Sequence, residues 1–220
     1  MALRNILQDG EAALLKKSRV ITDFNERLHM LIDDMRETLA EAGGVGLAAP
    51  QVGVLRRAVI VVETNVGEDE DGNEDGNGSG NDNDNDNDND NDNDNGIDNE
   101  SEDEFIIELI NPEIIESEGE QTGPEGCLSV PGACGIVTRP ERVKVRAQDR
   151  YGNTFEVEGT GLTARAFCHE IDHLDGKLYT EIAERMMDPE EIAAMNSVGD
   201  DYDEDLDEEL DEDYDESEEN

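Results

Sequence analysis

The chain has 220 residues, of which 35% are hydrophobic, and it carries 60 acidic against 16 basic residues, a formal net charge of −44 at pH 7. A chain of this length can bury the core of one domain. No stretch approaches the roughly 18 continuous apolar residues that a membrane span needs, which excludes a helical membrane protein.

The N-terminus and the cysteines indicate the compartment. MALRNILQDGEAALLKK lacks the long apolar run of a cleavable signal peptide, so we expect a cytoplasmic protein. The chain has three cysteines, an odd number without the spacing of a disulfide framework. Reduced thiols or metal ligands are therefore expected in place of disulfide bridges.

A helix is predicted over residues 23–42, with Asp23 as N-cap, Glu26 three residues on, and Gly43 and Gly44 ending it. We expect His29 within this helix to be structural or exposed rather than a metal ligand. The apolar residues at helical spacing are Leu28, Leu31, Ile32, Met35 and Leu39.

The rest of the domain is predicted as strands followed by a helix. Buried or paired strands are expected at 56–63, 104–110, 142–149 and 154–159, because these stretches are rich in β-branched residues or alternate in polarity. The last two form a hairpin. A helix over 162–174 ends at Gly176. Strands followed by a long helix predict an α+β fold.

Two acidic segments interrupt and follow this domain. Residues 64–104 contain 18 acidic residues and residues 199–220 contain 15, and neither has a lysine or arginine. They have too few apolar side chains to form a core, so we expect both to be disordered. The single catalytic domain is then 1–63 with 105–198. The tail has no basic or aromatic patch for nucleic acid, so DNA is not an expected partner.

The repeat within 64–104 partly resembles a calcium-binding loop. The pattern begins with Asn where Asp is usual, and no amphipathic helices flank it, so diffuse weak attraction of cations is the preferred interpretation. The residues at calcium-loop positions are Asn91, Asn93, Asn95, Gly96 and Glu102.

The sequence HEIDH (169–173) contains candidate metal ligands and a candidate catalytic residue. On a helix, His169 and His173 lie on one face and can reach one metal ion, with Glu170 beside them. This pattern is typical of zinc proteases, whose class depends on a third ligand. One protease class places a third His where this chain has Tyr179. Another takes a later Glu, for which Glu190 or Glu191 lacks the surrounding pattern.

The cysteines are the other candidates for the third ligand. Cys168 directly precedes His169, so on a helix it points about 100° away from it. Cys134 follows VPGA in an expected loop, and Cys127 lies in the expected tight turn PEGCLSVPG. The residues alone leave the choice open.

Three segments together resemble the peptide deformylases: GVGLAAPQ (44–51), EGCLS (125–129) and HEIDH (169–173). The resemblance extends over most of residues 1–190. It implies a peptide deformylase-like α+β fold, with antiparallel or mixed strands around a C-terminal metal-binding helix. It also implies that Cys127, with His169 and His173, binds the metal. The acidic segment replaces what is normally a short connection, and Cys168 stands where many members have Gln.

The resemblance further implies the reaction, which is hydrolytic removal of the N-formyl group from the N-terminal methionine of new proteins, releasing formate. Glu170 is the implied general acid and base, and the side chain of Gln51 with the N–H of Leu128 are the implied oxyanion donors. One divalent ion is implied, Fe²⁺ with Zn²⁺ as the alternative. The implied substrate-binding residues are Val45, Gly46, Leu162, Arg165 and Ala166.

The expected partners are N-formyl-methionyl nascent peptides and the ribosome, and the expected state is a monomer. The acidic tail should weaken docking to negatively charged ribosomal RNA. The alternative function is a deformylase-like binding protein without catalysis. Loss of a metal ligand, Gln51 or Glu170 would favour that alternative, and the sequence retains them all.

Overall fold

The structure of the chain is a computed structural model that describes residues 2–63 and 106–200. Predictions about segment 64–104, and about the tail beyond Asp200, lie outside the described residues. The helices are α1 (Glu26–Ala42), α2 (Gly161–Leu174) and α3 (Pro189–Asp200). The strands are β1 (Gly46–Ala48), β2 (Ala58–Val62), β3 (Ile106–Glu118), β4 (Gln121–Cys127), β5 (Val130–Arg139), β6 (Arg142–Gln148), β7 (Thr154–Thr160) and β8 (Arg185–Met186).

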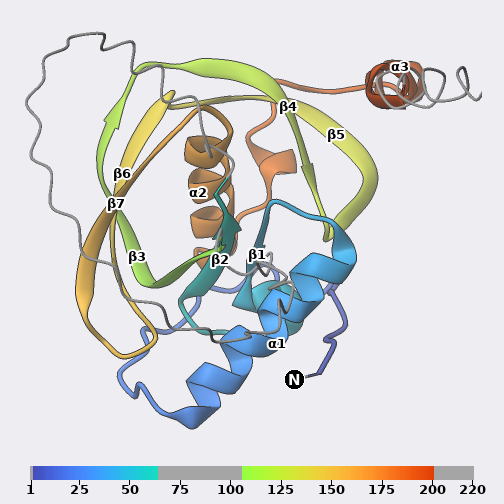
Figure 1. The fold of residues 1–220 in the computed structure, drawn as a ribbon. Coiled ribbons are helices and arrows are strands. Elements are labelled where there is room, and N and C mark those ends of the chain that lie inside the picture. The colour runs from blue at the N-terminus through green and yellow to red at the C-terminus, as the bar shows by residue number, and fades with distance from the viewer. Residues whose placement is uncertain (1, 64–105, 201–220) are drawn as a thin grey trace, which may run out of the picture.

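In the described part of the chain, a five-stranded antiparallel sheet lies between α1 and α2 (Figure 1). Its order is β1-β2-β3-β6-β7. Side chains alternate along β2, since Val59 and Val61 pack with the residues of α2, whereas Ala58 and Ile60 pack with those of α1. β2 is therefore buried on both faces.

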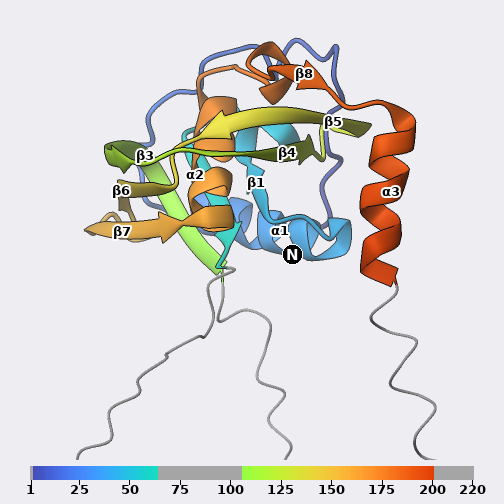
Figure 2. The same cartoon turned by 90° about the horizontal axis from the view of Figure 1, so that it is seen from above.

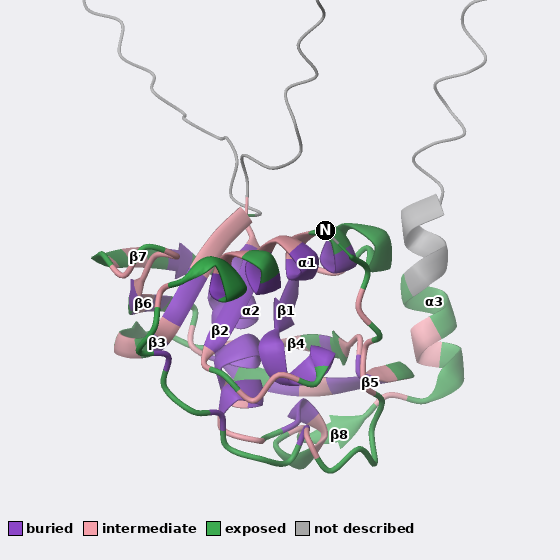
Figure 3. Ribbon diagram, turned by 90° about the horizontal axis from the view of Figure 1, so that it is seen from below, coloured by how far each residue is buried: buried purple, intermediate pink, exposed green. Residues whose placement is uncertain are grey.

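A second sheet, in the order β4-β5-β8, covers the other side of α2 (Figures 1 and 2). The metal-binding motif thus lies on a helix enclosed between two sheets. Figure 3 shows α2 as largely buried, whereas the described side chains of α3 (189–195) are mostly exposed, beside the body of the protein. No helix in the described ranges has both the length and the apolar character required to cross a membrane.

The first helix has a different N-cap from the one predicted. It begins at Glu26, and the side-chain oxygen of Asn25 accepts hydrogen bonds from the N–H groups of Arg27 and Leu28, at 3.0 and 3.4 Å. The prediction of Asp23 as cap is wrong by two residues, because both residue types can cap and the spacing alone did not separate them. The predicted end at Gly43 is confirmed, with φ of 63°.

β3 is much longer than predicted. The expected end at residue 110 is wrong, since the strand continues to Glu118 past a register shift at Asn111 and Pro112. Asn111 has a φ of 53°, and its side chain bonds the backbone N–H and carbonyl of Ile21, both at 2.8 Å. These bonds stabilise a β-bulge. The dipeptide Asn-Pro by itself indicates the end of a strand, which is why the prediction stopped there.

The expected turn around Cys127 is a strand end, and the expected loop at Cys134 is within a strand. β4 and β5 pair from Gln121↔Arg139 to Cys127↔Val130. Their Gly and Pro residues have low strand propensity, so pairing and not local preference defines this hairpin. The helix at 162–174 and the hairpin of β6 and β7 are confirmed.

Candidate metal centre and active site

The three predicted metal ligands lie together between α2 and the end of β4. Nε2 of His173 lies 3.1 Å from Nε2 of His169 and 3.3 Å from Sγ of Cys127. All three donor atoms lie within 4.8 Å of one another. A tetrahedral ion with ordinary metal–N and metal–S bonds would hold such donors about 3.3–3.6 Å apart. The arrangement therefore fits one divalent cation.

Glu125 orients the ring of His169 through the nitrogen that does not face the metal site. The sequence analysis did not identify this residue. Its Oε1 lies 2.7 Å from Nδ1 of His169, which leaves Nε2 of that ring free to face the metal site. The guanidinium of Arg139 donates to both oxygens of Glu125, at 3.1 and 2.7 Å, and that of Arg165 donates to Oε2 at 3.1 Å. Glu125 therefore connects His169, Arg139 and Arg165 in a buried ion network.

The electrostatics keep Glu125 ionised. Burial raises the pKa of its carboxyl group, but the hydrogen bonds with His169 and Arg139 outweigh this effect and lower it to about 2. Burial lowers the pKa of His173 to about 3, and the neighbouring His169 acts in the same direction. His173 is therefore neutral at physiological pH and offers a lone pair for a metal.

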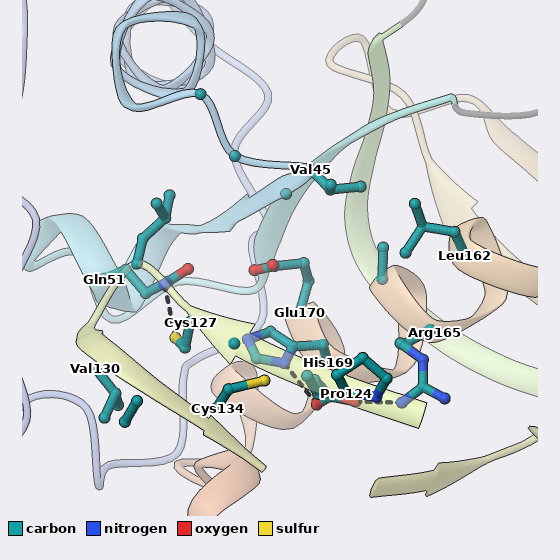
Figure 4. Close-up of a pocket in the computed structure, with 18 of the residues that line it drawn as sticks. Val45, Gln51, Pro124, Cys127, Val130, Cys134, Leu162, Arg165, His169 and Glu170 are labelled. Atoms are coloured by element: carbon teal, nitrogen blue, oxygen red, sulfur yellow. Dashed lines mark hydrogen bonds and ion pairs between the residues drawn. The ribbon is translucent and has the colours of Figure 1, made fainter. Parts of the chain in front are cut away.

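Glu170 lies in the buried wall beside these ligands (Figure 4). Burial raises the pKa of its carboxyl group to about 7. Its Oε2 has no hydrogen-bond partner among the described residues. Gly46 makes room for it, because a Cβ atom at that position would lie 2.7 Å from Glu170 Oε1. A buried carboxylate that titrates near neutrality is suited to proton transfer.

Gln51 points from the 3₁₀ helix Ala49–Val52 toward the metal ligands (Figure 4). Its Oε1 accepts a hydrogen bond from the N–H of Ala48 at 2.8 Å, which fixes the orientation of the amide. Its Nε2 then donates to Ser129 Oγ at 3.2 Å and lies 3.6 Å from Cys127 Sγ. Leu128, directly after Cys127, lines the same pocket.

A cavity of about 500 Å³ opens in front of the metal ligands. It lies between β1, an edge strand of the large sheet, and β4, an edge strand of the small one, with α2 as its floor. All predicted substrate residues line it: Val45, Gly46, Leu162, Arg165 and Ala166. The lining residues that the sequence analysis did not assign to the substrate site include Pro124, Ile192 and Met195.

Arg165 contributes to the cavity differently from an ordinary pocket residue. Its guanidinium is buried and donates to Glu125 and to the carbonyl oxygen of Val137, both at 3.1 Å. Its charge is therefore occupied by the ion network, and only its stem is available to a ligand.

The other candidate ligands do not belong to the group of three convergent donors among the described residues. The hydroxyl of Tyr179 donates to the carbonyl oxygen of Ala133 at 2.9 Å. Glu191 pairs with Arg185 at 2.8 Å. Cys168 is buried in the core, and burial raises the pKa of its thiol to about 11. Nε2 of His29 lies 2.9 Å from the carbonyl oxygen of Arg150, a structural contact, as predicted.

The fold and the centre define a metal-dependent hydrolase, and comparisons with known proteins specify the class. The family model described as polypeptide deformylase matches residues 3–188. A peptide deformylase of Lachnoclostridium phytofermentans is 50% identical over 181 residues, which cover 82% of this chain and 89% of the relative.

Solved structures agree. A peptide deformylase from Legionella pneumophila superposes with a TM-score of 0.62 at 35% identity, covering 91% of this chain and 95% of that one. A Met-Ala-Ser-bound class I type b peptide deformylase from Acinetobacter baumannii gives 0.62 at 30% identity, covering 82% and 98%. This chain belongs to the peptide deformylase family. Its reaction is the removal of the N-formyl group from newly made proteins.

Proposed function

We propose that the cavity deformylates N-formyl-methionyl peptides by the residues that surround it. The observation that carries the proposal is the position of the buried Glu170 beside three convergent metal donors at the edge of a peptide-sized cavity. A solved relative has the tripeptide Met-Ala-Ser bound, which supports a peptide in this cavity. The alternative of a non-catalytic binding protein is not favoured, since every group that the reaction needs is present.

The reaction is tested by anaerobic turnover of formyl-Met-Ala by protein loaded with iron, with formate as the measured product. Formate release at catalytic rates is the expected result. Binding of a full equivalent of iron without formate release would support the binding protein instead.

Cys127, His169 and His173 would hold one divalent ion, for which we propose Fe²⁺, with Zn²⁺ as the alternative. A thiolate with two imidazoles suits either ion. Such an ion, when bound, lowers the pKa of water and polarises the formyl carbonyl group. The chain's own part is to keep His173 neutral and to orient His169 through Glu125.

Glu170 is the proposed general acid and base. Its carboxylate accepts a proton from the attacking water and then donates it to the amine nitrogen that leaves. The raised pKa supports both steps, because a group that titrates near the working pH both accepts and donates efficiently.

Gln51 and Leu128 are the proposed donors to the formyl oxygen as it gains negative charge. We expect Gln51→Leu, which removes the amide N–H but keeps the volume, to lower kcat/KM by about 10²–10³-fold. The measurement is formate release at equal metal content. Ser129→Ala is the matched control, since it removes the contact of Nε2 but leaves the donor, and it should retain most activity.

The substrate backbone is proposed to lie extended along Val45 and Gly46. The carbonyl oxygen of Val45 accepts a hydrogen bond from Val62 at 2.8 Å, so β1 is paired on that side only among the described strands. Its other edge faces the cavity, where a peptide can add as a further strand. Leu162, Ala166 and the stem of Arg165 are the proposed wall for the methionine side chain.

We also propose a cytoplasmic monomer whose catalytic domain, 1–63 with 105–198, carries the two acidic segments as additions. One copy of the chain supplies every group of the site, which supports the monomer. Synthesis of the nascent substrate in the cytoplasm supports the location.

The ribosome is a proposed partner, and basic side chains without an ion pair support it. Among the described residues, four basic side chains have no carboxylate partner: Lys16, Arg19, Arg27 and Arg56. Arg19 and Arg56 lie on bridged segments, and Arg27 and Arg56 line a second cavity of about 330 Å³ away from the metal ligands. Unpaired arginines on an otherwise acidic protein suit the phosphates of RNA.

Deleting residues 201–220 should raise affinity for the ribosome, most at low salt, because the deletion removes repulsion from RNA. Arg27→Glu with Arg56→Glu should lower it, whereas Arg142→Glu with Arg146→Glu, an equal change in net charge at other exposed positions, should matter less. Sedimentation with ribosomes across salt concentrations measures both effects. Turnover of formyl-Met-Ala should stay constant, and equal binding of all variants would contradict the proposal.

A further inference from the structure

The helix α3 is held at the outer end of the cavity by its first turn. Oδ1 of Asp188 accepts hydrogen bonds from the N–H groups of Glu190 and Glu191, at 3.0 and 2.9 Å. Oε2 of Glu191 accepts one from the N–H of Asp188 at 3.0 Å. These reciprocal bonds form a capping box, which fixes the direction in which the helix leaves the chain before it.

The same turn is connected to the small sheet. Both terminal nitrogens of Arg185 donate to Glu191, each at 2.8 Å. Arg185 lies in β8 and pairs with Ile136 of β5, and the N–H of Met187 donates to the carbonyl oxygen of Cys134 at 2.8 Å. The start of α3 is therefore attached to the strand that forms one wall of the cavity.

Two apolar side chains of α3 reach this cavity. Ile192 and Met195 are three positions apart, so they lie on one face of the helix, and both line the cavity. Met195 is 43% exposed, so part of its apolar surface is accessible to a ligand. Figures 1 and 2 show α3 on the same side of the molecule as the C-terminal end of α1.

Many residues that line the cavity are small or apolar. They include Gly43, Gly44, Val130, Ala133, Ile192 and Met195. The charged lining residues belong to the metal centre and its ion network, since Glu170 lies beside the metal ligands, and Glu125 and Arg165 pair with each other. A peptide that extends along β1 away from Gly46 passes Gly44 and Gly43, and a following side chain then meets an apolar surface.

We propose that Ile192 and Met195 form a subsite for the peptide segment that follows the N-terminal methionine, and that this subsite favours an apolar side chain on the face of the extended peptide turned toward α3. The inference rests on the proposed function and adds a determinant of substrate preference to it. Methionine is unbranched and flexible, so Met195 can pack against side chains of different shape. The enzyme would then process formyl peptides with an apolar residue on that face most efficiently.

The test compares two formyl tripeptides of equal length, formyl-Met-Leu-Leu and formyl-Met-Gly-Gly, which share the same backbone. We expect the protein to prefer the leucine peptide by about tenfold in kcat/KM, mainly through KM, because the leucine on that face buries apolar surface against α3. The double variant Ile192→Ser with Met195→Ser should lose this preference, because its kcat/KM for the leucine peptide should fall by about tenfold, toward the value for the glycine peptide.

Ala193→Ser is the matched control, since it adds a hydroxyl group to an exposed position of the same helix and should keep the preference. Calorimetric binding of the products Met-Leu-Leu and Met-Gly-Gly gives a readout that does not depend on turnover, and it should show the same difference. Equal Kd values for the two products, or equal losses for both substrates in the double variant, would overturn the inference. Absence of formate release with a preserved binding difference would overturn the proposed reaction instead.

Discussion

Replacing Glu170 with Gln should lower formate release by about 10²–10⁴-fold, the contribution expected of a positioned general acid and base. Gln keeps the volume and polarity of the side chain, and Glu170 Oε2 has no described partner to lose. The measurement is kcat/KM for formyl-Met-Ala at matched metal content. Activity within tenfold of the unmodified protein would assign proton transfer to another group.

The same substitution should stabilise the metal-free protein. Burial raises the pKa of Glu170 from 4.5 to about 7, so the folded protein loses stability as pH rises from 4.5 to 7. Above pH 7 the free energy of unfolding should be lower by about 3 kcal/mol. A Gln at this position does not ionise, so the variant should not show this decrease. Thermal unfolding of both proteins at pH 5 and pH 8 checks this, since the difference should appear at pH 8. A buried carboxyl group whose ionisation destabilises the fold is expected to be retained for catalysis and not for stability.

Glu125→Gln should have the largest effect on the fold. The substitution removes the charge that compensates Arg139 and Arg165 in a buried network, and breaking such a network costs about 3–5 kcal/mol. It also removes the carboxylate that orients His169, which should weaken metal affinity by about 10–100-fold. Denaturant unfolding and metal titration measure the two effects. Glu181→Gln, at an exposed position, is the matched control and should change neither.

The pH dependence of stability distinguishes this residue from Glu170. The pKa of Glu125 is lowered from 4.5 to about 2, so its contribution is present above pH 4.5 and is lost as pH falls toward 2. The unmodified protein should lose stability over this acidic range more steeply than the Gln variant. Parallel curves for the two proteins would show that the network does not depend on the charge of Glu125.

Much of the site could be predicted because its residues are contiguous in short motifs. His169, Glu170 and His173 follow from helical spacing, and Cys127 and Gln51 follow from the resemblance carried by neighbouring residues. Glu125 belongs to the same motif as Cys127, but a Glu before Gly looks like a surface turn. Its role depends on Arg139 and Arg165, which approach only after β4, β5 and α2 have packed together.

The fold, like the site, could be predicted from the sequence only in part. Periodicity predicted α2 and the hairpin of β6 and β7, where local preference and tertiary structure agree. It failed for β4 and β5, whose Gly and Pro residues are ordered by pairing across the hairpin. Ile192 and Met195 lie in α3, and only the attachment of α3 to β8 brings these two side chains to the cavity.

The hairpin of β2 and β3 has a practical consequence. Val62 of β2 pairs with Ile106 of β3, and the N–H of Val62 also donates to the carbonyl oxygen of Val45, which lines the cavity. Closing a loop becomes only slowly more costly as it grows, by about 0.6 kcal/mol per doubling in length. A fluorophore or a small reporter domain carried between these strands would therefore leave the core intact. From that position it could register the arrival of a nascent chain during translation.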